Sequence, residues 1–204
     1  MEKTDLREAA AACARASAVL DAVQEDLLAW ADRKAKVLED YQRDLRRLQE
    51  VARELPANWH AATASQVAAG EVLGKPAILR RYLIYAQERL GEEERRLLRR
   101  FEREPWFYTI FLVERPIEGE FYRVRDHGAG DALLLYSPAL TKLHRQGASL
   151  FFTLFFYNGL CYQTFGPLHY YRGFHPFDFA YLAKAVRPDL YRTCLLYTSD
   201  AADE

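Results

Sequence analysis

The sequence predicts an α+β fold, in which a long N-terminal helical, coiled-coil region is followed by an aromatic-rich antiparallel β-sheet domain with flanking helices. Residues 1–105 carry 19 basic and 19 acidic side chains but 6 aromatic ones, whereas residues 106–193 carry 21 aromatic side chains and 16 charges. Charged, alanine-rich segments favour helices, and aromatic segments punctuated by Gly and Pro favour strands. The expected division is 1–56 (long amphipathic helix), 57–105 (helical connector), 106–193 (sheet domain) and 194–204.

The first segment has the pattern of one very long helix. Residues 5–55 contain no Gly or Pro, and Asp5 with Glu8 supplies an N-cap signal. A heptad frame places apolar side chains at 13 of 15 a and d positions; Lys34 and Asp44 are the exceptions. About 50 helical residues would extend about 75 Å, which is too long to be covered by one small domain. We therefore expect a partner helix, which is either a second copy of residues 5–55 or a later helix folded back, with a possible bend near Lys34.

The connector predicts shorter helices. Residues 62–74 indicate a weak helix or linker interrupted by Gly70 and Gly74, Pro76 is suited to the first position of a helix, and residues 92–104 begin another. The arginines of residues 92–104 alternate with glutamates at helical spacing, which favours pairing on a solvated helix surface. We therefore expect no nucleic-acid partner.

After Pro105 the pattern predicts five antiparallel strands and a closing helix. The strands are expected at 106–114, 120–125, 132–136, 149–157 and 160–165, and the helix at 176–186. Asn158-Gly159 predicts a two-residue type I′ hairpin between the last two strands. The strands at 106–113 and 150–157 are apolar on both faces. Helices are expected to cover one face, and a second layer, a later segment, a subunit or an apolar ligand the other.

The composition excludes several classes of protein. Residues 194–204 resemble translated transposase-type sequencing adapter, so we expect the natural sequence to continue differently after about Thr193. Without the three acids of that segment the formal charge is +2, which calls for neither nucleic acid nor an anionic membrane. No apolar run approaches the roughly 20 residues of a membrane span, and the N-terminus lacks a secretory pattern. We expect a cytoplasmic protein without membrane contact.

Candidate chemistry is concentrated in residues 158–178, and three interpretations compete. Cys161 and His169 have the residue types of a nucleophile and its base. His169, His175 and Asp178 have metal-ligating side chains, although their spacing matches no standard site. The third interpretation, which we favour, is structural. The most plausible ligand-binding side chains of this segment are Gln163, Tyr170 and Arg172.

The remaining cysteine, Cys13, lies so far from Cys161 in the sequence that the two predict neither a disulfide framework nor a zinc site. No motif indicates a cofactor. The sequence therefore favours a non-enzymatic interaction or regulatory protein. It would oligomerise through residues 5–55 and bind a protein or an apolar small molecule with its aromatic domain. The alternative is a hydrolase or transferase that uses Cys161, His169, His175 and Asp178.

Overall fold

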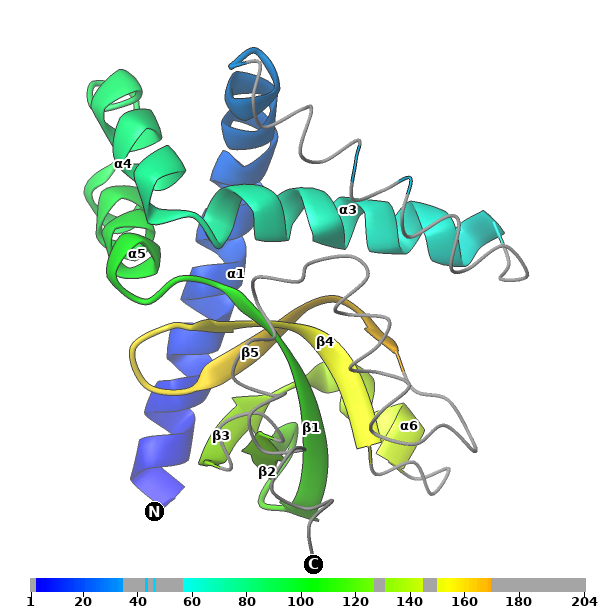
Figure 1. Cartoon of the computed structure of the whole chain (residues 1–204). Coiled ribbons are helices and arrows are strands. Elements are labelled where there is room, and N and C mark those ends of the chain that lie inside the picture. The colour runs from blue at the N-terminus through cyan, green and yellow to red at the C-terminus, as the bar shows by residue number, and fades with distance from the viewer. Residues whose placement is uncertain are drawn as a thin grey trace, which may run out of the picture.

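The computed structural model describes residues 3–34, 43, 46, 57–126, 131–144 and 150–169, and it contains both helices and a sheet, as predicted (Figure 1). The helices are α1 (Lys3–Asp32), α3 (Ala57–Leu73), α4 (Pro76–Tyr85), α5 (Glu92–Arg103) and α6 (Pro138–His144). The strands are β1 (Phe107–Pro116), β2 (Phe121–Asp126), β3 (Ala132–Tyr136), β4 (Leu150–Tyr157) and β5 (Tyr162–His169). The expected helix at 176–186 lies outside the described residues. None of the described helices is long and apolar enough to cross a membrane.

The five strands close into a barrel in the order β1-β2-β3-β5-β4. Four of the pairings are antiparallel, but β3 and β5 run parallel, with Leu135 opposite Tyr162 and Tyr136 opposite Gln163. The expectation of a purely antiparallel sheet is therefore wrong at this pairing, where closure brings the two edge strands together. A five-stranded Greek-key barrel is the architecture of the OB-fold, and such an architecture does not by itself assign a function.

Closure of the barrel explains why two strands are apolar on both faces. Along β1 and β4, Phe111, Phe151 and Phe155 belong to the cluster shared with β2 and β3. The alternate side chains, among them Ile110 and Phe156, belong to the cluster shared with the helices. The barrel's own interior therefore covers the second face, and no additional layer, subunit or apolar ligand is required there.

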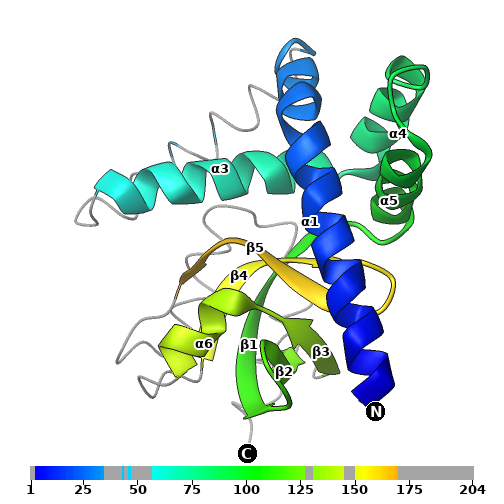
Figure 2. The ribbon, with the colours of Figure 1, turned by 180° about the vertical axis from the view of Figure 1, so that it is seen from behind.

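Helix α1 packs against both the barrel and the helical layer, by which we mean α3, α4 and α5, as the two opposite views show (Figures 1 and 2). Its first half contributes Leu6, Ala9 and Cys13 to a cluster with Phe121 and Cys161 of the barrel. Its second half packs with α3, α4 and α5. All eight a and d positions from the first to Trp30 are at most 7 % exposed: Leu6, Ala9, Cys13, Ala16, Leu20, Val23, Leu27 and Trp30.

The apolar stripe of α1 is thus covered by other parts of the same chain, as far as the described residues show. Of the two expected partners, later helices of the same chain, together with the barrel, cover the stripe up to Trp30. Helix α1 ends at Asp32, and the backbone turns at Arg33 and bends at Lys34. One uninterrupted helix over residues 5–55 is therefore wrong. Self-association through this region stays a prediction.

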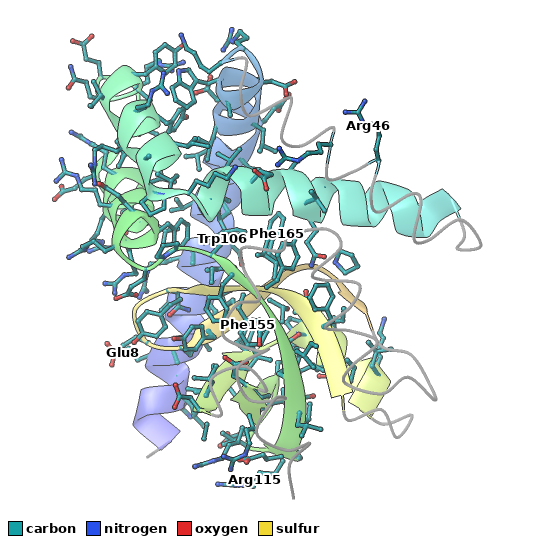
Figure 3. All side chains as sticks on the ribbon, in the orientation of Figure 1. Glu8, Arg46, Trp106, Arg115, Phe155 and Phe165 are labelled. Atoms are coloured by element: carbon teal, nitrogen blue, oxygen red, sulfur yellow. The ribbon has the colours of Figure 1, made fainter. Side chains whose placement is uncertain are left out.

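The junction between the helical layer and the barrel is closely packed. Trp106, which precedes β1, stacks on Phe156 with ring centroids 4.7 Å apart and lies 5.0 Å from the Phe165 ring (Figure 3). The Gln66 side chain of α3 donates to the Thr153 hydroxyl at 2.8 Å and to the Phe165 carbonyl at 2.6 Å. The Gln66 amide and the Thr153 hydroxyl are thus hydrogen bonded where α3 crosses β4 and β5.

This packing requires a glycine at position 74. A Cβ atom there would lie 2.5 Å from the Gly70 carbonyl oxygen and 2.9 Å from the Trp106 carbonyl oxygen, and both are backbone atoms that cannot rotate away. We expect Gly74→Ala to lower the free energy of unfolding by about 1–3 kcal/mol, measured by urea denaturation. The control is Gly91→Ala, whose Cβ would first meet a flexible Glu94 side chain at 3.5 Å. Equal stability of the two variants would contradict this account of the junction.

Candidate functional site

The loop that joins β4 to β5 is organised by the side chain of Asn158. Its Oδ1 atom accepts hydrogen bonds from the backbone N–H groups of Leu160 and Cys161, at 2.9 and 3.0 Å. Gly159 adopts a φ of +109°, a conformation that favours glycine. Residues 158–161 form a four-residue loop, so the expected two-residue hairpin is wrong in length. The reason is the Asn158 side chain, which accepts hydrogen bonds from the loop amides of Leu160 and Cys161. In a tighter turn, backbone carbonyl groups of the paired strands would accept such bonds.

The same side chain lies against two thiols. Its Nδ2 atom is 3.2 Å from the Cys13 sulfur and 3.5 Å from the Cys161 sulfur, and the two sulfurs are 3.4 Å apart. Cys13 comes from α1 and Cys161 from the loop, and both are free thiols with at most 1 % of their surface exposed. The fold therefore brings together two cysteines that are 148 positions apart in the sequence.

Gln163 completes this thiol cluster, by which we mean Cys13, Asn158, Cys161 and Gln163. Its Oε1 atom accepts from Asn158 at 3.0 Å, and its Nε2 atom donates to the Cys13 carbonyl at 3.4 Å and to the Ser17 hydroxyl at 3.5 Å. Gln163 is 4 % exposed. It therefore ties β5 to α1, and a ligand in solvent does not reach it directly.

The hydrogen bond between the sulfurs affects the two thiols in opposite directions. The bond from Cys13, with help from Asn158, lowers the pKa of Cys161 below its ordinary value, although burial acts against this. The same bond to Cys161, together with burial, raises the pKa of Cys13. The pair thus favours one thiolate held by one thiol, and it disfavours a second thiolate beside the first.

An aromatic cleft is lined in part by the two residues that flank this loop, Tyr157 and Tyr162. It has a volume of about 420 Å³ and is lined by Glu104, Pro105, Phe107, Tyr157 and Tyr162. These residues meet where α5 ends, β1 begins, β4 ends and β5 begins. The Tyr162 ring is 5.1 Å from the Tyr157 ring and 6.0 Å from the Phe107 ring, and all three rings are half-buried.

One carboxylate lines the cleft, and two more act on the Tyr162 ring hydroxyl from nearby. Burial raises the pKa of Tyr162, and the nearby carboxylates of Glu104, Asp126 and Asp131 raise it further. The Glu104 carboxylate also lies at the C-terminal end of α5, where the helix dipole is negative. Arg100 faces the same ring cluster, with its guanidinium carbon 5.9 Å from the Tyr157 ring centroid and its nitrogen 3.9 Å from Glu104.

The structure separates the residues expected to react together. Cys161 precedes β5, and His169 is the last residue of that strand, opposite Phe152 of β4. Eight steps along an extended chain correspond to about 26 Å, so the structure does not bring Cys161 and His169 together. Tyr170, Arg172, His175 and Asp178 lie outside the described residues. Among the described residues, no group of three or more His, Cys, Asp or Glu side chains is arranged to hold a metal ion.

Sequence reasoning missed both the thiol cluster and the aromatic cleft. The available signal for the first was that Cys13 occupies an inward-facing heptad position, which places its thiol on the buried side of α1. No signal in the sequence pairs that position with Cys161. For the cleft, Tyr157 and Tyr162 flank the hairpin signal, and this predicts their proximity but not that of Glu104.

The polarity of the Asn158 amide is testable by one isosteric substitution. In Asn158→Asp an oxygen replaces the Nδ2 donor and faces the Gln163 Oε1 atom at 3.0 Å and both sulfurs, while the acceptor for the loop amides is retained. We expect the free energy of unfolding to fall by about 1–3 kcal/mol at neutral pH, because a half-buried carboxylate would face the Gln163 acceptor. Urea denaturation measures this. The control is the reverse exchange at an exposed position, Asp131→Asn. An equally small effect of both substitutions on the free energy of unfolding would show that the Asn158 amide does not organise the cluster.

Comparison of the chain with protein-family models, with curated proteins and with solved structures gives no match.

Proposed function

We propose that this chain is a cytoplasmic binding protein rather than an enzyme, and that its aromatic cleft holds an organic cation such as a methylated ammonium group. The observation that carries the proposal is the meeting of three aromatic rings and one carboxylate, Phe107, Tyr157, Tyr162 and Glu104, around one open volume. This refines the expectation of a partner or small-molecule ligand for the aromatic domain, and replaces an apolar ligand by a cationic one.

The rings supply the first part of the attraction. The face of an aromatic ring is electron-rich, and a cation within about 6 Å of its centroid gains roughly 0.5–2 kcal/mol, depending on how far it is desolvated. Half-buried rings from β1, β4 and β5 line the cleft, so one ligand group can contact more than one ring. A volume of about 420 Å³ is within the range of small-molecule sites.

The charges supply the second part. Glu104, Asp126 and Asp131 all act on Tyr162, and the C-terminus of α5 adds a partial negative charge. A carboxylic acid or phosphate ligand would be repelled by these groups. A neutral apolar ligand would gain nothing from them. The acidic surroundings therefore favour a cation over the other ligands of similar size.

The chain already places one of its own cations beside a ring of the cleft, although Arg100 itself lines the neighbouring groove. The Arg100 guanidinium lies over Tyr157 and near Glu104. This contact supports the view that the Tyr157 ring accepts a cation, so a ligand cation on that ring would compete with Arg100. The proposal therefore predicts opposite effects for removing the carboxylate and for removing the guanidinium.

The enzyme alternative has less support. Its nucleophile, Cys161, is 1 % exposed and bonded to a second thiol, and its expected base lies at the far end of β5. Its remaining residues, His175 and Asp178, lie outside the described residues. A nucleophile must be accessible to its substrate and must lie within hydrogen-bond distance of its base. Cys161 is buried and far from His169, so it meets neither condition.

The test compares choline with 3,3-dimethylbutan-1-ol, its uncharged isostere, by NMR titration of the full chain at constant ionic strength. We expect choline to bind and the alcohol not to. Tyr157→Leu should weaken choline binding by about 2- to 30-fold, the range that the loss of one cation–π contact predicts. Glu104→Gln should weaken it by about 2- to 5-fold, and Arg100→Gln should strengthen it.

Two matched variants separate binding from folding. Tyr157→Phe keeps the ring and loses only the hydroxyl that donates to the Gly159 carbonyl at 2.9 Å, so choline affinity should persist. Tyr85→Leu removes an exposed tyrosine outside the cleft that also lies beneath an arginine, Arg89, at 4.5 Å, and should have no effect. Equal binding of choline and the alcohol, or no binding of either, would refute the cationic ligand.

Self-association through residues 5–55 is a second proposal. Because the stripe up to Trp30 is covered by the chain itself, any contact between copies would involve the heptad positions after Lys34, such as Leu48 and Val51. We expect the full chain to sediment as an oligomer and the double variant Leu48→Glu, Val51→Glu as a monomer. Gln49→Glu, which lies outside the a and d positions, is the control. A monomeric parent chain would contradict the prediction.

A further inference from the structure

The thiol cluster has the arrangement that a disulfide requires, although both cysteines are reduced. The two sulfurs lie 3.4 Å apart, and a disulfide bond is about 2.05 Å long, so a relative shift of about 1.4 Å would join them. One sulfur is on α1 and the other on the loop between β4 and β5, so the pair spans two elements that pack together without a covalent connection between them.

The pair is buried, but a groove leads to its edge. A groove of about 280 Å³ between α1, α5 and the loop is lined by Ala12, Ala16, Asn158 and Leu160, among others. Ala12 and Leu160 are the immediate neighbours of the two cysteines, and Asn158 contacts both sulfurs. An oxidant no larger than a few atoms therefore needs only a small displacement of the Asn158 side chain to reach a sulfur.

We infer that Cys13 and Cys161 form a modification site that hydrogen peroxide oxidises to an intramolecular disulfide, which fixes α1 covalently to the barrel. This goes beyond ligand binding in the aromatic cleft and does not depend on it. Cys161 is the first sulfur to react, because hydrogen bonds from Cys13 and Asn158 favour its thiolate.

The chemistry balances in two steps. The Cys161 thiolate attacks one peroxide oxygen, the O–O bond breaks, and hydroxide leaves and takes up a proton, which gives a sulfenic acid and water. The Cys13 sulfur then attacks the sulfenic sulfur, an S–S bond forms, the S–O bond of the sulfenic acid breaks, and the oxygen leaves as water with the thiol proton. Two thiols and one peroxide become one disulfide and two waters, so peroxide accepts the two electrons.

Oxidation would stabilise the chain because it closes a very long loop. The cross-link joins positions 148 residues apart, and such a loop removes much of the entropy of the unfolded chain. For a protein of this size we expect the midpoint of thermal unfolding to rise by about 5–15 °C. Oxidised α1 would then no longer separate from the barrel.

The experiment uses the full chain with Cys194→Ser, which removes the third cysteine. The protein is treated with hydrogen peroxide, remaining thiols are alkylated in denaturant, and tryptic peptides are mapped by mass spectrometry without reductant. We expect one cross-linked species that joins the peptides of Cys13 and Cys161, with two hydrogens fewer than the sum of the thiol peptides. Reductant should separate them and reverse the rise in the thermal midpoint.

The controls are Cys161→Ser and Cys13→Ser in the same background, neither of which should gain thermal stability with peroxide. Glutathione in the same tube shows that the dose oxidises an accessible thiol. Recovery of both cysteines as free thiols after glutathione is consumed would overturn the inference. So would cross-links between chains only, or stable sulfinic acid without a disulfide. The peptide map of the Cys194→Ser chain decides the question even if a single-cysteine variant fails to fold.

Discussion

The packing of the apolar stripe of α1 is the interaction on which the other contacts of this chain depend. The stripe is buried against two different bodies, the barrel over its first half and the helical layer over its second. Each large apolar side chain fully removed from water contributes about 1.5–3 kcal/mol, and several such side chains lie along this one helix. The position of α3, α4 and α5 relative to the barrel follows from this shared contact and from the Trp106 junction.

The loop between β4 and β5 is the place where structure and proposed chemistry meet. Tyr157, at its start, supplies a ring to the aromatic cleft, and Asn158 and Cys161 belong to the thiol cluster. The two sites therefore share one four-residue segment, whose conformation is set by one amide side chain: cluster residues lie within it, and the cleft residues Tyr157 and Tyr162 flank it. We expect changes in the packing of α1 on this loop to move the Tyr157 ring in the cleft, because Tyr157 directly precedes the loop residues that contact α1.

The barrel explains the extreme aromatic content of the second half of the chain. The interior of a small closed barrel is filled by bulky side chains. Its outer face also carries bulky apolar side chains wherever helices pack against it. Phe111 and Phe155 fill the interior, whereas Trp106 and Phe156 pack beneath α5 and its neighbours. Rings left at the end of the strands, such as Tyr162 and Phe107, are half-buried. The cleft is thus a consequence of how the barrel ends and of the carboxylate that α5 places beside it.

The sequence by itself determined the kind and the position of most elements. The division at Pro105, the inward face of α1 and the five strands all follow from local periodicity, which depends on side chains a few positions apart. It also allowed a bend near Lys34, although no proline requires one there. What it did not determine was the partner of each apolar face, because burial is equally favourable against any apolar surface.

Only the tertiary structure decided those partners. It showed that α1 packs on its own chain up to Trp30, that β3 pairs in parallel with β5, and that Cys13 meets Cys161. Each of these contacts joins residues that are far apart along the chain. Their closure depends on the summed geometry of every intervening element, which no local pattern records. The cleft shares this origin, since Glu104 reaches Tyr162 only after the barrel has closed.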